Sequence, residues 1–202
     1  MPSKKPYTAI PRFYDLLDLP FEYGRDRPIR RTMFEGVDGD ILDAGVGTGR
    51  NMVFYPPGAA MTGIDLSPAM LARARQRKSD KRIDADLFEM DVTDTTFADD
   101  RFDFIIATFL FCVLDDEYQL PALKELRRVC KPDGEIRILE YAYSQNPWRR
   151  FVMRLWAPWV RVMYGATFDR RTEDYVDAAG LRLVEQRYLY KDIIKLLVLR
   201  RQ

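Results

Sequence analysis

The sequence predicts an α/β protein with a doubly wound, Rossmann-like sheet of seven strands, parallel except for an antiparallel hairpin at its C-terminal end. Two observations predict this fold. Five short apolar segments, typical of strands buried on both faces, alternate with segments that carry helix signals. The last two strand-like segments, 181–190 and 193–199, are separated by two residues, which leaves no room for a crossover helix.

The first five strands are predicted from apolar runs that end at turn signals. They are expected at 40–44, 60–64, 86–89, 102–108 and 135–139. Residues 132–134, Pro-Asp-Gly, are predicted as the turn that leads into the last of these strands.

The helices are predicted from their start and stop signals. Ser67-Pro68 is an N-cap followed by a first-turn proline, and Pro56-Pro57-Gly58 ends the short helix before it. The helices are expected from Pro11 to Pro20, at 28–34, between 49 and 56, at 67–78 and at 120–130.

Composition limits the classes of function. The chain has 202 residues, 47% of them apolar, and a net charge of +1, which suits one α/β domain and gives no reason to expect a nucleic-acid partner. There is no histidine, and the two cysteines, Cys112 and Cys130, are far apart in apolar segments. The sequence therefore offers neither a Cys/His zinc site nor a histidine general base. No other metal site is predicted. Without a signal-like apolar segment or an apolar run of about 18 residues, the expected location is cytoplasmic.

A glycine-rich loop follows the strand predicted at 40–44. Gly45, Gly47 and Gly49 stand between this strand and a helix, which is the context that a nucleotide-binding loop requires. Glycine lets the backbone approach a ligand closely, and the N-terminus of a helix offers free N–H groups. The pattern alone also fits a simple turn, so further residues have to decide.

Polar side chains stand at the ends of four predicted strands. Because ligands of doubly wound sheets bind beyond the carboxyl ends of the strands, these side chains are expected to meet at one site. Asp43 suits a positively charged amino group, Asp65 the two ribose hydroxyls, and Asp91 an adenine amino group. Asp65 also fits a simple helix start, and a dinucleotide site would not require Asp91. The four side chains are Asp43, Asp65, Asp91 and Thr108.

On these residues the chain resembles the class I methyltransferases, which use S-adenosylmethionine (SAM). The resemblance covers roughly residues 12–140. The matching segments are 41–49 for motif I, 63–71 for the acidic second motif, 102–107 for the fourth strand and 126–135 for the approach to strand five. Within this class, segments 51–58 and 108–114 are most similar to bacterial phosphatidylethanolamine N-methyltransferases and to membrane-associated alkyl-thiol methyltransferases.

The resemblance implies SAM as the cofactor and S-adenosylhomocysteine as its product. It also implies roles for individual residues around the cofactor. In this interpretation Gly45 and Gly47 flank the methionine part, Asp65 and Leu66 hold the ribose, Asp91 and Val92 hold the adenine edge, and Tyr14 closes over the methyl donor.

Three segments are expected in the domain organisation. Residues 1–36 are predicted to form an N-terminal helical cap, and residues 37–202 the SAM-binding domain. Within that domain, residues at about 141–174 are expected to form a lid over the acceptor pocket. The sequence makes no prediction of oligomeric state.

The lid segment contains an amphipathic helix, at about 147–164, with tryptophan and arginine, a pattern typical of membrane surfaces. Pro158 predicts a kink or two short helices. Three interpretations remain open: a helix packed on its own domain, an element that contacts an anionic membrane or a lipid, and a dimer interface. Arg25, Arg27, Arg30 and Arg31 either add to an anion site or form a solvated face. The apolar face holds Trp148, Phe151, Val152, Leu155, Trp156, Trp159, Val162 and Met163, and the opposite face Arg150, Arg154 and Arg161.

These features predict an enzyme that methylates a small lipophilic acceptor, with the amine head group of a phospholipid such as phosphatidylethanolamine as the first choice. The alternatives are methylation of a small thiol or other soluble metabolite, and a non-catalytic SAM-binding protein that docks on membranes. Because a sulfonium is already a strong methyl donor, alignment and exclusion of water supply most of the catalysis. Glu140 and Tyr141 are predicted to assist proton removal from the acceptor, and each of them, like the nearby candidate Tyr143, also fits a structural role such as a pocket wall. Peripheral contact with the inner face of the membrane is also expected.

Overall fold

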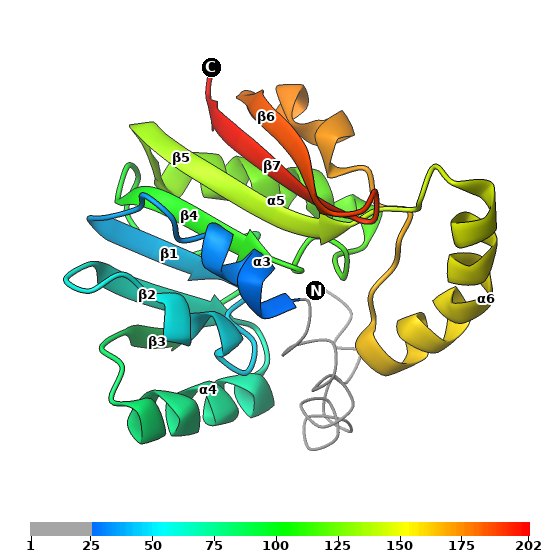
Figure 1. Cartoon of the computed structure of the whole chain (residues 1–202). Coiled ribbons are helices and arrows are strands. Elements are labelled where there is room, and N and C mark those ends of the chain that lie inside the picture. Colours follow the sequence, from blue (N-terminus) through cyan, green and yellow to red (C-terminus); the bar gives the residue numbers. More distant parts are fainter. Residues whose placement is uncertain (1–25) are drawn as a thin grey trace.

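The computed structural model describes residues 26–202, apart from the side chains of Met163 and Tyr164. The helix predicted from Pro11, and with it Tyr14 and Arg25, lies outside the described residues. Seven strands form one sheet in the order β3-β2-β1-β4-β5-β7-β6 (Figure 1). The strands are β1 (Asp40–Ala44), β2 (Ala60–Asp65), β3 (Asp86–Glu89), β4 (Phe102–Thr108), β5 (Cys130–Tyr141), β6 (Leu181–Tyr190) and β7 (Ile194–Arg201).

The predicted direction of the strands is confirmed. Strands β1 to β5 pair in parallel, and β7 pairs antiparallel with both β5 and β6. The carboxyl ends of the five parallel strands therefore lie at one edge of the sheet, where a cofactor is expected.

Helices cover the two faces of the sheet. The predicted cap at Ser67 is present, because its side chain accepts a hydrogen bond from the Met70 N–H at 3.4 Å. The helical elements are α3 (Arg27–Thr32), η2 (Arg50–Phe54), α4 (Pro68–Lys81), α5 (Asp116–Val129), α6 (Pro147–Tyr164), η3 (Thr172–Tyr175) and η4 (Asp177–Ala179).

Two apolar clusters lie on opposite faces of the sheet. Successive residues of a strand point to opposite faces, so Leu42 packs with α5 residues such as Leu123, whereas Ile41 packs with Met33, which directly follows α3. All four side chains are fully buried. This double burial explains why the parallel strands read as continuous apolar runs.

The structure differs from the sequence prediction at the start of β5 and at the start of α5. Residues 132–134, predicted as a turn, belong to β5, which shifts its register against β4 between Phe102 and Phe104. Gly134 permits this close approach, because a Cβ there would lie 2.8 Å from the carbonyl oxygen of Asp103. Helix α5 begins at Asp116 rather than at 120, and Pro121 lies inside it.

Helix α6 lies at the side of the sheet to which the arrows of the parallel strands point (Figure 1). It is one helix that changes direction along its length and contains Pro158, so the predicted kink is present and the helix is not split. None of the helices between residues 26 and 202 has the length and hydropathy needed to span a bilayer.

Candidate functional site

The loop after β1 makes a sharp turn that three glycines permit. Gly45, Gly47 and Gly49 have φ angles of +75°, +55° and +80°. The Gly45 N–H donates to the carbonyl of Ile64 at 2.9 Å, which fastens the loop to β2. A Cβ on Gly47 would meet no protein atom closer than 4.0 Å. The space beside Gly47 is thus open for a ligand that approaches the backbone.

Asp65 connects the glycine loop to the start of α4. Its carboxylate accepts hydrogen bonds from the Gly47 N–H at 2.9 Å and from the Ser67 N–H at 2.8 Å. Burial raises the pKa of Asp65, and the two backbone hydrogen bonds oppose that rise. Leu66 follows with 54% of its surface exposed, so an apolar face lies next to the carboxylate.

Asp91 and Val92 follow the end of β3. The Asp91 carboxylate accepts hydrogen bonds from the backbone N–H of Thr93 at 2.9 Å and from its hydroxyl at 2.7 Å. The Met90 N–H donates to the carbonyl of Asp65 at 3.2 Å, so this segment runs beside the end of β2. The Val92 side chain is buried in the core, which leaves its backbone as the part that can face a cofactor.

Asp43 is the centre of a buried polar network. Its two carboxylate oxygens accept hydrogen bonds from the Asn51 amide at 3.0 and 3.1 Å, and one also accepts from the Tyr55 hydroxyl at 2.7 Å. The same Asn51 amide group lies 3.1 Å from the Thr108 hydroxyl, and its carbonyl accepts from Arg30 at 2.9 Å. Burial raises the pKa of Asp43 to about 6, while the bonds from Tyr55 and Asn51 oppose the rise.

Asn51, Tyr55 and Arg30 are site residues that the sequence analysis did not assign. Asn51 and Tyr55 lie in the segment 51–58, which was used only for its resemblance to a family. Arg30 was grouped with Arg27 and Arg31, but Arg30 is buried and the other two are exposed. Nothing in the sequence distinguishes Arg30 from its neighbours, because spacing does not show which polar side chain of a short helix turns inward.

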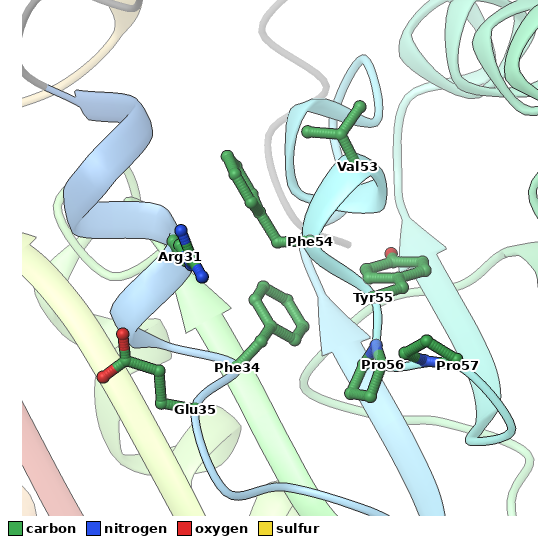
Figure 2. Close-up of a pocket in the computed structure, with 8 residues that line it drawn as sticks. All are labelled: Arg31, Phe34, Glu35, Val53, Phe54, Tyr55, Pro56 and Pro57. Atoms are coloured by element: carbon green, nitrogen blue, oxygen red, sulfur yellow. The ribbon is translucent and has the colours of Figure 1, made fainter.

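A groove of about 550 Å³ lies between α3 and η2. Figure 2 shows the rings of Phe34, Phe54 and Tyr55 around it. Tyr55 belongs to both features, because its ring lines the groove and its hydroxyl donates to Asp43. The lining consists of Arg31, Phe34, Glu35, Val53, Phe54, Tyr55, Pro56 and Pro57.

The structure places Glu140 and Tyr141 on opposite faces of the sheet. Glu140 has no exposed surface and accepts a hydrogen bond from Thr172 at 2.8 Å, and its other oxygen lies 3.1 Å from the Lys195 ammonium. Burial raises the pKa of Glu140 to about 7, and the Lys195 charge opposes this rise. Tyr141 instead stacks on Phe109 with ring centroids 4.6 Å apart. Two neighbouring strand residues cannot both face one pocket, so the predicted pair is divided.

An aromatic series begins at the end of β4. The Phe109 ring has Tyr141 on one side and the Arg30 guanidinium 5.2 Å from its centroid. Tyr141 packs edge-on against Phe168, which in turn contacts Tyr143. The φ of Phe109 is +56°, a strained conformation for an aromatic residue. Such strain is found where a loop has to present side chains in a fixed way, and here it lies directly after Thr108, the last residue of β4.

Cys112, which lies in an apolar segment of the sequence, belongs to the core. The side chain is fully buried, and its thiol donates to the carbonyl of Phe109 at 3.3 Å. Burial raises the pKa of the Cys112 thiol to about 12, so the thiolate that a nucleophile requires is not formed near neutral pH.

The strand order, the glycine loop after β1 and the acidic residues at the ends of β1, β2 and beyond β3 define the class I methyltransferase fold and site. Solved structures support the fold. A SAM-dependent methyltransferase from Clostridium acetobutylicum has a TM-score of 0.72 at 12% identity, covering 94% of this chain and 97% of that one. Geranyl diphosphate C-methyltransferase from Streptomyces coelicolor, solved with S-adenosylhomocysteine, has a TM-score of 0.73 at 15% identity, covering 94% and 84%.

Sequence comparisons identify the family. The family described as "Methyltransferase domain" matches residues 41–134. Phosphatidylethanolamine N-methyltransferase from Cereibacter sphaeroides is 34% identical over 147 residues, which are 69% of this chain and 71% of that protein. Demethylmenaquinone methyltransferase from Tropheryma whipplei is 32% identical over 164 residues, 79% of this chain and 64% of that protein. The chain belongs to the SAM-dependent methyltransferases, and SAM is its methyl donor.

Proposed function

We propose that this methyltransferase acts on a lipophilic acceptor at a membrane surface, and that the acceptor is the amine head group of a phospholipid such as phosphatidylethanolamine. The observation that carries the proposal is the exposed aromatic side of α6 beside the carboxyl end of β5. The relatives named for phosphatidylethanolamine and for demethylmenaquinone support it, because both acceptors are lipids. The protein then works as a peripheral protein on the cytoplasmic face of the membrane.

The cofactor lies, in this proposal, along the edge formed by the ends of β1 to β4. Gly45 and Gly47 flank the methionine part, and Gly49 completes the turn. Asp43 and Thr108 lie on the side of its amino group. The remaining contacts follow the order of the strands. Asp65 and Leu66 hold the ribose, and Asp91 with the backbone of Val92 holds the adenine edge.

Methyl transfer to an amine needs a neutral nitrogen. Its lone pair attacks the methyl carbon of SAM, the S–C bond breaks, and the new ammonium has to lose a proton before another methylation. The Tyr141 phenol is the better placed of the two predicted groups to contact the acceptor, because Glu140 is buried and bonded to Thr172. We assign Glu140 a positioning role through Thr172 and Lys195.

The acceptor is tested by supplying radiolabelled SAM with three pools: phosphatidylethanolamine in detergent micelles, a demethylated menaquinone chemically reduced to its quinol in the same micelles, and a panel of small thiols. Label in phosphatidylethanolamine is expected. Label in the quinone alone would transfer the function to the second candidate, C-methylation of a lipophilic quinol, which the 32% identical relatives favour. Label in thiols alone would contradict a lipid acceptor.

SAM affinity is expected to fall below pH 6. The pKa of Asp43 is raised to about 6, so its carboxylate becomes neutral in this range and loses its attraction for the SAM ammonium. The loss approaches tenfold per pH unit, by the linkage of one proton to one binding event. Isothermal titration calorimetry at a series of pH values measures it. Asp43→Asn should bind SAM weakly with no such slope, and an equal slope in that variant would contradict the assignment.

A further inference from the structure

Helix α6 presents its apolar side chains to solvent. Trp148 is 73% exposed, Leu155 64% and Val162 76%, although an amphipathic helix of a globular protein ordinarily buries such a face. The interpretation that this face packs on its own domain is therefore wrong. The side of the helix with lower exposure is a different one, formed by Arg149, Met153, Ala157 and Val160. The exposed apolar face consists of Trp148, Phe151, Val152, Leu155, Trp156, Trp159 and Val162.

Positive charge lies on the polar side of the helix, away from the centre of this apolar face. At 100° per residue, Arg150, Arg154 and Arg161 fall on one stripe, and all three are exposed. Among the described residues, no acidic side chain forms an ion pair with any of the three. The helix itself contains no aspartate or glutamate. An exposed apolar face with arginines on the opposite, polar face is the pattern of a helix that lies in the interface of an anionic bilayer.

The base of α6 is fixed to the catalytic sheet. The Asp192 carboxylate, in the turn between β6 and β7, accepts hydrogen bonds from the Ser144 hydroxyl at 2.7 Å, from the Gln145 N–H at 2.8 Å and from Arg149. The Ser144 hydroxyl is the main cause that holds the pKa of Asp192 well below its usual range. The two ends of the segment that contains α6 are also joined, because the Tyr143 N–H donates to the carbonyl of Phe168 at 3.0 Å. A surface bound by α6 thus has a set position relative to the end of β5.

We propose that α6 is a docking helix that lies in the plane of an anionic lipid bilayer, with its tryptophans among the head groups and its arginines on the lipid phosphates. The biological purpose of this docking rests on the proposed function. The docking surface is the membrane from which the lipid acceptor would be taken. A second copy of the chain is a poorer occupant, because pairing two α6 helices adds arginines without supplying any carboxylate to neutralise them.

The three tryptophans of the chain all lie on α6, so tryptophan emission, excited selectively over that of tyrosine, reports on this helix alone. With the full chain, vesicles of phosphatidylcholine plus phosphatidylglycerol are expected to shift the emission to shorter wavelength, and brominated acyl chains to quench it. Vesicles of phosphatidylcholine alone should do so at least about tenfold less well, as a charge-dependent partition requires. An emission unchanged by anionic vesicles would overturn the proposal.

Variants locate the binding surface by vesicle flotation. Leu155→Glu/Val162→Glu changes two exposed residues and is expected to lower flotation with anionic vesicles at least about tenfold. Arg154→Glu/Arg161→Glu should remove the preference for anionic lipid. Val184→Glu, at a residue of β6 that is 47% exposed, is the matched control and should float as the unchanged protein does. Thermal unfolding verifies that each variant is folded.

Two results would contradict the docking role of α6. One is full flotation of Leu155→Glu/Val162→Glu. The other is a dimer of the unchanged protein in sedimentation velocity that the same substitutions dissociate, which would make α6 an interface between copies. The proposed function fails separately. If the unchanged protein binds vesicles but labels no lipid in micelles, the lipid acceptor is wrong while the docking surface stands.

Discussion

Asp65→Ala is expected to weaken SAM binding about a hundredfold or more while the protein stays folded. The carboxylate is proposed to hold two ribose hydroxyls, and hydrogen bonds to a charged group are worth about 1.5–3 kcal/mol each. The same carboxylate accepts hydrogen bonds from the Gly47 and Ser67 N–H groups, so alanine also loosens the loop that is proposed to receive the methionine part. Calorimetric titration with SAM measures the loss.

The control for Asp65 is Glu89→Ala. Glu89 ends β3, pairs with Asp65 in the sheet register and has an exposed side chain, so its removal takes away a neighbouring charge without touching the loop. SAM should bind this variant with little change. Unchanged SAM affinity in Asp65→Ala would show that Asp65 does not bind the cofactor. An equal loss of SAM affinity in Glu89→Ala would show that the effect comes from the overall negative charge of this region.

Lys195→Met is expected to destabilise the fold by about 3–5 kcal/mol at alkaline pH, where Glu140 is ionised, because it leaves a buried carboxylate without its counter-charge. The Lys195 side chain is 3% exposed and lies 3.1 Å from Glu140 and 2.5 Å from Glu173. Denaturant unfolding at several pH values measures the change. The loss should shrink toward acid, because there Glu140 is protonated in the folded state and needs no partner.

A double variant separates charge from packing in this cluster. Lys195→Met/Glu140→Gln removes both charges, keeps the volumes similar and should recover part of the lost stability. Glu140→Gln alone also tests the positioning role. It should change KM or kcat with the pH profile preserved, whereas a profile that loses its limb near pH 7 would identify Glu140 as the proton acceptor itself.

Much of the sheet and of the cofactor edge could be predicted from the sequence. Doubly buried strands such as β1 and β4 read as apolar runs, and the glycine loop after β1 stands between a strand and a helix, which is the context of a nucleotide-binding loop. The cofactor edge followed from topology, since parallel strands bring Asp43 and Asp65 to the same side. These are local signals, or consequences of strand direction, and the sequence contains both.

The remaining features depend on tertiary contacts. A bulge that includes Gly134 has the same residues as a turn, and only pairing with β4 distinguishes the two. The periodicity of α6 identified its apolar face correctly but not what that face contacts, because amphipathicity does not state whether the neighbour is protein or solvent. The alternation of strand side chains, by contrast, was available in the sequence and already separates Glu140 from Tyr141.

The raised pKa of Asp43 has opposite effects on two properties. As pH rises, the stability of the protein without cofactor falls, whereas the expected affinity for SAM rises. Asp43, with its pKa raised from 3.8 to about 6, binds its proton more tightly when folded, so stability without cofactor is fully present below pH 3.8 and declines as pH rises to about 6. In the proposed site, SAM binds the ionised form of Asp43, which becomes more populated as pH rises. The cofactor is therefore most needed as a thermal stabiliser under the conditions in which it binds best, and the increase in Tm that SAM produces should grow from pH 5 to pH 7.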